Sequence, residues 1–250
     1  MIKLFRNIRA RLLAENKIGR YLIYALGEII LIIFGILIAL QINNWNEKRK
    51  EAILEKQILR EIKDNLELDT NYFAARINRQ TEIAHKINRL IHHLEAGLAY
   101  HDSLDNYFFL PVLLEDFQIV RSGYETLKSL GLEKLKSEKI KNAMSGYFDR
   151  DGSSFSNLVE QKNQDNTRSM SLFNKEHFRR IASTYSSFDP SFVPTGYKPI
   201  AYDDLLTDPL YLNFLYERKG YKLGTYNMIL EDAGQQAADL LDLIEKELMK

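Results

Sequence analysis

The sequence predicts an all-α fold, in which one N-terminal transmembrane helix continues into an antiparallel bundle of long helices. Three observations lead to it. Residues 21–42 are almost entirely apolar, residues 46–96 contain neither proline nor glycine, and most of the remaining chain has helix-type spacing of apolar residues. No alternating run of polar and apolar residues is long enough for a sheet, and no period of about 20–50 residues indicates repeats.

Residues 21–42 have the length and composition of a membrane-spanning helix. The stretch is 22 residues long and carries one charged residue, Glu28. At about 1.5 Å per residue it reaches about 33 Å, close to the roughly 30 Å hydrocarbon core of a bilayer. Tyr21, Tyr24 and Trp45 border it, and amphipathic rings favour the headgroup level. No small-x-small cleavage site follows, so we expect an uncleaved anchor in the lipid bilayer rather than a signal peptide.

The basic residues around this span predict its orientation. Residues 1–20 carry six Lys or Arg and one acid, whereas the basic residues at 48–50 stand among acids. Because Lys and Arg set orientation, we expect a cytoplasmic N-terminus. Residues 43–250 would then form a helical bundle domain on the periplasmic, extracytoplasmic side of the cytoplasmic (inner) membrane. The apolar spacing of residues 3–13 predicts either an amphipathic helix on an anionic leaflet or a basic flank with no binding role.

Three residues of the span are candidates for contact with a partner inside the membrane. Gly35 and Ala39 form a small-xxx-small pair, which permits close approach of a second helix, although both residue types are common in spans. Glu28 is an acidic residue inside the span. Placing a charge in the bilayer costs free energy, so such residues are candidates for a function. Glu28 also lies close enough to the end of the span for its side chain to reach the membrane–water interface. We therefore expect a protein partner or a homo-oligomer, formed through the span or the bundle.

Charge and composition exclude several classes of function. Residues 1–42 hold six basic and two acidic residues, and the rest of the chain holds 28 basic and 32 acidic residues. A mildly acidic domain is unsuited to neutralising phosphates, so we expect no nucleic acid partner. The chain has no cysteine, which excludes disulfides, thiolate zinc sites and a cysteine nucleophile.

The helices of the bundle are predicted from apolar spacing and from capping residues. A long amphipathic helix is expected over residues 46–96, either continuous with the span or separate from it, and Gly97 begins its termination. Ser122 and Glu125 have the spacing of a capping box at the start of the next helix. The further helices are expected at residues 123–130, 137–149, 154–183 and 208–249.

Glycines, prolines and polar runs predict where the chain turns. Gly131 is expected to end the helix at 123–130, Gly152 is expected at a turn, and the polar run 163–167 is a candidate break. Residues 184–207 hold three prolines and several aromatic residues, which predicts a long, packed loop. Asp208 is the expected N-cap of the last helix, with Pro209 at its first position. Gly220 and Gly224 would either bend that helix or admit a close neighbour.

Candidates for metal chemistry are weak. Glu82 and His85 have the Glu-x-x-His spacing of di-iron bundles, but the sequence holds no second such pair. His92 lies one heptad further, which fits either a shared metal or, as we favour, a solvated helix face. Residues 149–160 are similar to a calcium loop, but the glycine stands at the fourth position rather than the sixth. We therefore predict no metal, no cofactor, no catalytic residue and no enzyme.

One cluster of polar residues is a candidate pocket. Arg121, Tyr124 and Glu125 fall together with Lys128 at a predicted helix start. These side chains could line a small polar pocket. The alternative, which we favour, is that they cap the helix and pair with one another on its surface.

Two stretches of the sequence resemble a known family. They are GEIILIIFGILIALQINNWNEKRK, which follows a basic segment and ENK-x-x-x-YLIYALGE, and SGYETLKSLGLEKLKSEKIKNAMSGYFD at residues 122–149. The first resembles the N-terminal anchor of an uncharacterised family of small bacterial single-span membrane proteins, and the second is similar to that family's middle region. The resemblance implies an N-terminal anchor and a helical domain, and it implies no activity, substrate or catalytic residue.

Three classes of function fit these observations. The first is a membrane-anchored helical interaction or sensor module, in which contact with a ligand or partner alters the packing of the bundle. The second is a structural or scaffold subunit of a bacterial envelope complex. The third is a membrane-attached enzyme with an unrecognised site, for which Glu82 and His85 are the only hint. We expect the first, because the chain combines one span, a long stalk helix and no recognised catalytic set.

Overall fold

A computed structural model describes residues 18–174, 177–180 and 197–250 of the chain. Within these ranges the fold is all-α, as the sequence predicts, apart from one two-stranded hairpin. The chain divides into two compact units, whose boundary falls between Lys56 and Gln57, inside the long helix α2 (Ile18–Glu95). The segment predicted to be an amphipathic helix, residues 3–13, lies outside the described residues.

In the first unit, the described residues are helical, and the apolar side chains from Ile29 to Ile42 are exposed. Leu31 exposes 67% of its surface, Ile38 58% and Trp45 66%. Water disfavours such a surface, whereas a bilayer core accommodates it. In the described part of the chain, one helix is long and apolar enough to cross a membrane, and it begins near the N-terminus. The prediction of a helix over residues 21–42 that continues into residues 46–96 is confirmed.

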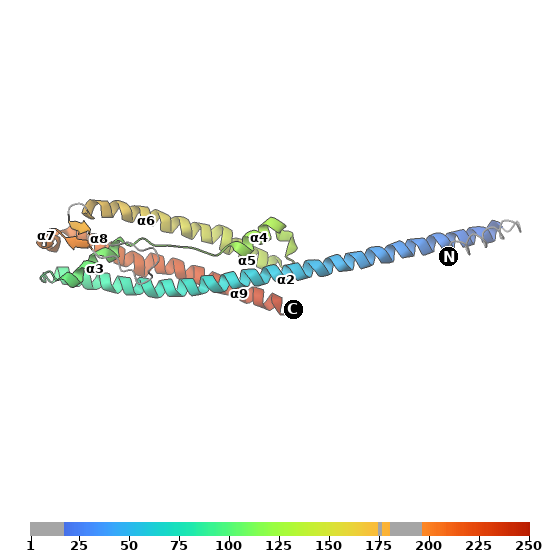
Figure 1. The fold of residues 1–250 in the computed structure, drawn as a ribbon, viewed down its shortest axis with the longest axis horizontal. Coiled ribbons are helices and arrows are strands. Elements are labelled where there is room, and N and C mark those ends of the chain that lie inside the picture. Colours follow the sequence, from blue (N-terminus) through green and yellow to red (C-terminus); the bar gives the residue numbers. More distant parts are fainter. Residues whose placement is uncertain (1–17, 175–176, 181–196) are drawn as a thin grey trace. The chain divides into compact units, whose positions relative to one another are not determined.

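The second unit is a bundle of long helices joined by short helical turns. Figure 1 shows α6, α8 and α9 running alongside the second half of α2. The elements after α2 are η1 (Asp102–Leu104), α3 (Asp105–Phe109), η2 (Leu110–Val112), α4 (Ser122–Leu130), η3 (Leu132–Lys134), α5 (Glu138–Met144), η4 (Ser145–Asp151), α6 (Gly152–Asn174), β1 (Phe178–Arg180), β2 (Tyr197–Pro199), α7 (Tyr202–Thr207), α8 (Pro209–Tyr221), η5 (Lys222–Tyr226) and α9 (Asn227–Leu248). Both η4 and η5 are π-helical.

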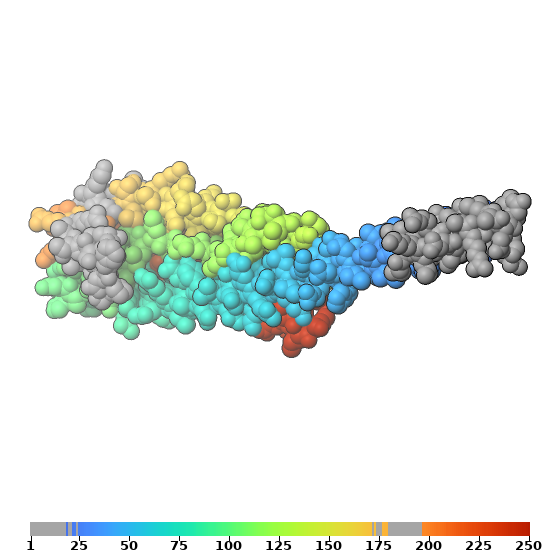
Figure 2. All heavy atoms as spheres, turned by 45° about the vertical axis from the view of Figure 1, so that its right-hand side comes forward, coloured from blue at the N-terminus to red at the C-terminus, as the bar shows by residue number. Residues whose placement is uncertain are grey.

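One face of α2 forms a large part of the bundle core. Ile62 and Ile87 lie on it and are fully buried, as the three- and four-residue spacing predicts. Two apolar clusters join this face to the other helices; Phe73, Val159 and Ile229 belong to one, and Leu90, Phe173 and Leu215 to the other. The space-filling view shows the residues of α4 to α6, green to yellow, lying against the teal residues of α2 (Figure 2).

Helix α2 ends at a glycine, as predicted. Gly97 has a φ of 61°, a conformation in which a Cβ atom is unfavourable. Its N–H donates to the carbonyl of Leu94 at 3.0 Å, and the N–H of Leu98 donates to that of His93 at 3.2 Å. This pair of hydrogen bonds is the Schellman motif, which satisfies carbonyl groups at the end of a helix.

The capping box predicted at Ser122 is wrong. Ser122 is the first residue of α4, and its hydroxyl donates to Oδ1 of Asn65 on α2 at 3.0 Å. The same oxygen accepts the N–H of Gly123 at 2.9 Å. The unpaired N–H groups at a helix start need an acceptor, and here a side chain 58 residues earlier in the chain supplies it.

The cap predicted for the last helix is confirmed. Oδ1 of Asp208 accepts the N–H of Leu210 at 2.8 Å, and Pro209 occupies the first helical position. Beyond it, α8, η5 and α9 follow without a break. Among the described residues, a Cβ atom on Gly220 or Gly224 would meet nothing within 4 Å, so the second alternative, a close neighbour, is not found there; Gly224 lies in the π-helical η5.

The turn predicted at Gly152 is also wrong. Gly152 has φ −60° and ψ −36°, which is right-handed helix, and η4 runs directly into α6 there. A Cβ atom at this position would lie 2.5 Å from Cδ1 of Ile119 and 2.8 Å from the carbonyl oxygen of Tyr147. Glycine is therefore required by close packing, not by backbone conformation.

Helix α6 continues through the polar run at residues 163–167 and ends at Asn174, so the predicted break and the predicted end at residue 183 are both wrong. The run does not break the helix because two of its residues, Asn163 and Asn166, face the bundle and are buried. The hairpin of β1 and β2, in which Phe178 pairs with Pro199, was not expected from the sequence. Most of the loop predicted at 184–207 lies outside the described residues.

Replacing Gly152 tests this packing. Gly152→Ala should lower the free energy of unfolding by about 1–3 kcal/mol, because overpacking must displace Ile119 or the helix backbone. Gly146→Ala, in the π-helical η4 directly before α6, is the matched control, since its Cβ would lie 3.5 Å from the nearest atom, a nitrogen of Arg150. Urea denaturation of the full chain in detergent micelles measures both. Equal stability of the two variants would contradict the packing argument.

Candidate functional site

A non-helical segment, residues 113–121, runs between η2 and α4 inside the second unit. It is here called the connecting segment. Several of its backbone groups are paired with side chains of the surrounding helices. Asn163 of α6 makes two such bonds to Glu115, accepting its N–H at 2.9 Å and donating to its carbonyl at 2.7 Å. The carbonyl of Asp116 accepts the hydroxyl groups of Tyr72 and Tyr226. Buried backbone without a sheet or helix needs partners of this kind.

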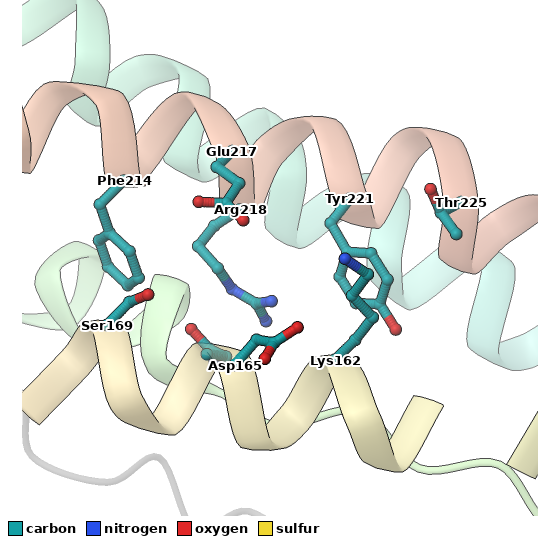
Figure 3. A pocket seen from close by; sticks show the side chains of 9 residues that line it. Lys162, Asp165, Ser169, Phe214, Glu217, Arg218, Tyr221 and Thr225 are labelled. Atoms are coloured by element: carbon teal, nitrogen blue, oxygen red, sulfur yellow. The ribbon is translucent and has the colours of Figure 1, made fainter. Parts of the chain in front are cut away.

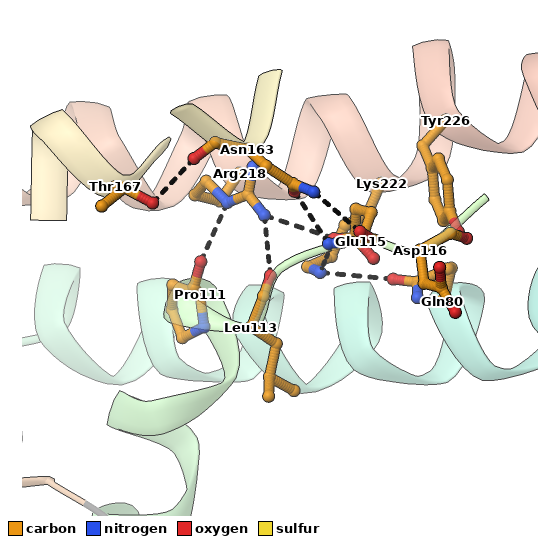
Figure 4. A network of polar contacts seen from close by, with 10 residues as sticks. All are labelled: Gln80, Pro111, Leu113, Glu115, Asp116, Asn163, Thr167, Arg218, Lys222 and Tyr226. Atoms are coloured by element: carbon orange, nitrogen blue, oxygen red, sulfur yellow. Dashed lines mark hydrogen bonds and ion pairs between the residues drawn. The ribbon is translucent and has the colours of Figure 1, made fainter. Parts of the chain in front are cut away.

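The side chain of Glu115 lies at the centre of a buried ionic cluster, which Figure 4 shows. Its Oε1 accepts from Nη2 of Arg218 at 3.2 Å and from Nζ of Lys222. Arg218 also donates from Nε to the carbonyl of Pro111 at 2.9 Å and from Nη2 to that of Leu113 at 3.0 Å. One acid and two bases therefore fasten the connecting segment to α8 and η5.

Burial changes the pKa values of this cluster. It lowers the pKa of Lys222 to about 8, and the nearby charge of Glu115 opposes the change. Burial also lowers the pKa of Arg218. In both cases loss of water disfavours the charged form, and the adjacent carboxylate restores part of that loss. Gln80 on α2 accepts a further hydrogen bond from Lys222 at 3.2 Å.

A second buried acid, Asp69 of α2, holds the other end of the connecting segment. Its Oδ1 accepts the N–H of Val120 at 2.9 Å, and its Oδ2 accepts the hydroxyl of Tyr147 at 2.8 Å. Burial raises the pKa of Asp69 to about 6, and these two hydrogen bonds and the charge of Arg121 oppose the increase. Tyr147 lies in the π-helical η4, as Lys222 lies in the π-helical η5.

A cavity of about 190 Å³ opens between α6 and the α8–η5 stretch, beside the Glu115 cluster. Figure 3 shows the guanidinium group of Arg218 pointing across it towards α6. Polar and charged side chains dominate its lining. The lining residues are Lys162, Asp165, Asn166, Ser169, Phe214, Glu217, Arg218, Tyr221 and Thr225.

Arg121, Tyr124 and Glu125, for which a polar pocket is the less favoured interpretation of the sequence, lie in different environments. Tyr124 is fully buried; its hydroxyl donates to Oδ2 of Asp149 at 2.5 Å and its ring stacks on Phe148. Glu125 is exposed. Arg121 lines a separate shallow hollow with Ile119 and Ser156, among other residues. Tyr124 is thus part of the core rather than of a ligand site.

The residues considered as metal ligands are either exposed on a helix surface or part of a regular helix. Glu82, His85 and His92 are exposed, and Glu82 pairs with Lys86 at 2.7 Å. Residues 149–160 are helical and form no calcium-type loop. Among the residues that the structure describes, no group of three or more His, Asp or Glu is placed to hold a metal ion.

The intramembrane candidates lie in the first unit. Gly35 and Ala39 are exposed, and a Cβ on Gly35 would meet no described atom within 4 Å. Glu28 is partly exposed. These residues are accessible to a partner helix, and their role stays a prediction.

Sequence reasoning missed the Glu115 cluster and the cavity. One signal was present, because Phe214, Arg218 and Lys222 recur every four residues and therefore share one helix face. A base on an apolar face indicates a buried partner. The sequence does not show that this partner is Glu115, which lies 103 residues before Arg218.

Residues 28–108 match the model of a family of unknown function, DUF6090. The matched range extends from the apolar part of α2 into α3 and ends before the connecting segment begins. No curated protein and no solved structure matches the chain. Glu115, Asn163, Arg218 and Lys222 therefore lie outside the range of the DUF6090 match.

Removing the carboxylate of Glu115 tests the ionic cluster. Glu115→Gln should lower the free energy of unfolding by about 3–5 kcal/mol, because it leaves Arg218 and Lys222 buried without their carboxylate. Adding Lys222→Met should cost less than the sum of the two single changes, since the residues are in direct contact. The measurement is urea denaturation of the full chain in micelles.

The control for this cycle is an exposed pair. Lys246→Met removes the ion pair with Asp242 and should change the free energy of unfolding by less than about 1 kcal/mol. Additive effects of Glu115→Gln and Lys222→Met would contradict the cluster.

Proposed function

We propose that the chain is a bacterial inner-membrane protein with one span in α2, and that residues 43–250 form an extracytoplasmic helical interaction or sensor module. The observation that carries the proposal is the row of exposed apolar side chains in the first unit, with Leu31, Ile38 and Trp45 each more than half exposed. A bilayer is the environment in which this surface is stable. The basic residues at 1–20 favour a cytoplasmic N-terminus.

An interaction module fits the second unit better than an enzyme does. Its buried charged groups mainly hold the connecting segment: Glu115 pairs with Arg218, and Arg218 also donates to the backbone carbonyl of Pro111. A signal would pass to a partner inside the membrane, through Glu28, Gly35 or Ala39. A scaffold subunit of an envelope complex would use the same anchor without any ligand.

Charges placed in the centre of the span test the anchor. Ile33→Arg with Leu37→Arg should move the full chain from the carbonate-resistant membrane fraction to the soluble fraction, since each arginine costs about 2.5–3.5 kcal/mol at the centre of a span. Ile53→Arg is the matched control, because Ile53 is an exposed apolar residue of the same helix outside the span. Extraction of the unaltered chain by carbonate would contradict the anchor.

One engineered cysteine tests the orientation. The chain has no cysteine, and Ser153 is exposed near the start of α6. Ser153→Cys should react with a membrane-impermeant thiol reagent in cells whose outer membrane alone is permeabilised. Reaction only after lysis would place the bundle in the cytoplasm and overturn the proposed orientation.

A further inference from the structure

Two polar side chains in the cavity between α6 and α8 have no partner. Asn166 is 4% exposed, and neither its Nδ2 nor its Oδ1 has a hydrogen bond among the described residues. Tyr221 is 8% exposed, and no described group pairs with its hydroxyl. Both residues line the cavity. Buried polar atoms in folded proteins nearly always have partners, so these groups call for one from outside the chain.

The charges around the cavity have both signs. Lys162 and Arg218 are basic, and Asp165 and Glu217 are acidic. The bonds from Arg218 to the protein use Nε and Nη2, and its guanidinium group faces the cavity (Figure 3). Arginine is well suited to carboxylates, while the acids on the rim suit an ammonium group.

The neighbouring Glu115 cluster strengthens the preference for a carboxylate beside Arg218. One acid there contacts two bases, Arg218 and Lys222. When Lys222 is charged, the cluster carries an excess positive charge next to the cavity. Arg218 and Lys222 are themselves buried, and the lower dielectric around them strengthens their attraction for an anion placed beside Arg218.

We propose that this cavity binds a small zwitterion with one carboxylate and one ammonium group, such as a free α-amino acid. The carboxylate lies against Arg218 and the Nδ2 of Asn166, and the ammonium group lies towards Asp165 and Glu217. The ring of Phe214 offers an apolar wall for a small side chain. The cavity of about 190 Å³ exceeds the roughly 30 Å³ of one water molecule. It is smaller than the roughly 300–1,000 Å³ of pockets for drug-sized ligands.

This inference deepens the proposed function, because it names the ligand class of the sensor module and rests on that proposal for the consequence of binding. Binding itself depends on the second unit alone. A chain that binds an amino acid but leaves the membrane would overturn only the anchor. A chain that stays in the membrane without binding would overturn only the ligand site.

The test is binding to the full chain in detergent micelles at neutral pH. The probes are L-alanine, L-serine and L-leucine, with propionate and propylamine as molecules that carry one charge each. We expect at least one amino acid to raise the Tm and to give a calorimetric binding signal. Propionate and propylamine should bind at least about tenfold more weakly, since each lacks one charge-assisted contact.

Substitution of Asn166 separates a binding role from a structural one. Asn166→Leu should weaken binding of that amino acid at least about tenfold. It should not lower the Tm of the free protein, because it removes buried polar atoms that have no partner. Gln161→Leu, an exposed amide on the same helix, is the matched control and should leave the affinity unchanged.

Three results would overturn the proposal. They are no Tm shift with any of the three amino acids, equal affinity for propionate, and an Asn166→Leu variant that loses stability but keeps the affinity. Tyr221→Phe provides a second check, because it removes the hydroxyl and keeps the ring, and it should also weaken binding.

Discussion

The second unit depends on the burial of a stretch of backbone that is neither helix nor strand. Residues 113–121 pass between helices; Glu115 and Phe117 are buried there, Leu114 and Gln118 are exposed, and the others are half-buried, so that part of the N–H and C=O groups of this segment is shielded from water. Each such group would cost about 1–3 kcal/mol if left without a partner. The helices supply those partners from side chains, with Asp69, Asn163 and Arg218 making the key bonds. The helix positions are therefore tied to one another through the segment between them.

Two π-helical turns bring residues onto the two buried acids at either end of this segment. Lys222, the first residue of η5, reaches Glu115, and Tyr147, in η4, reaches Asp69. A π-turn inserts an extra residue into a helix and shifts the faces that follow. The two π-helical turns are thus found where the polar side chains of Tyr147 and Lys222 must point into the bundle. The cavity with Asn166 and Tyr221 lies beside one of these turns, since Thr225 of η5 also lines it.

The sequence predicts those features of the fold that depend on neighbouring residues. The apolar face of α2, its end at Gly97 and the cap at Asp208 are local, and all three are confirmed. The features that it does not predict depend on distant contacts. Gly152 was expected at a turn, but it is glycine because Ile119 packs against it. Ser122 has the spacing of a cap, yet Asn65 takes the capping role.

In the candidate site, too, local features can be predicted from the sequence and contacts between distant residues cannot. Tyr124 and Glu125 adjoin in sequence, but one is core and the other is solvent-exposed. The cavity takes residues from α6 and α8, about 50 positions apart in the chain. Spacing along one helix indicates which residues share a face, as for Arg218 and Lys222, but not what lies opposite.

Native-state hydrogen exchange of individual amides in the connecting segment and at the start of α4 tests this account most directly. The N–H groups of Glu115, Val120 and Gly123 donate to buried side chains. They should exchange as slowly as the core amides of α2 near Ile62, whereas the amide of Leu114, which is 53% exposed, should exchange faster. Exchange of the amides of Glu115, Val120 and Gly123 at the rate of the Leu114 amide would show that the segment does not hold the bundle together.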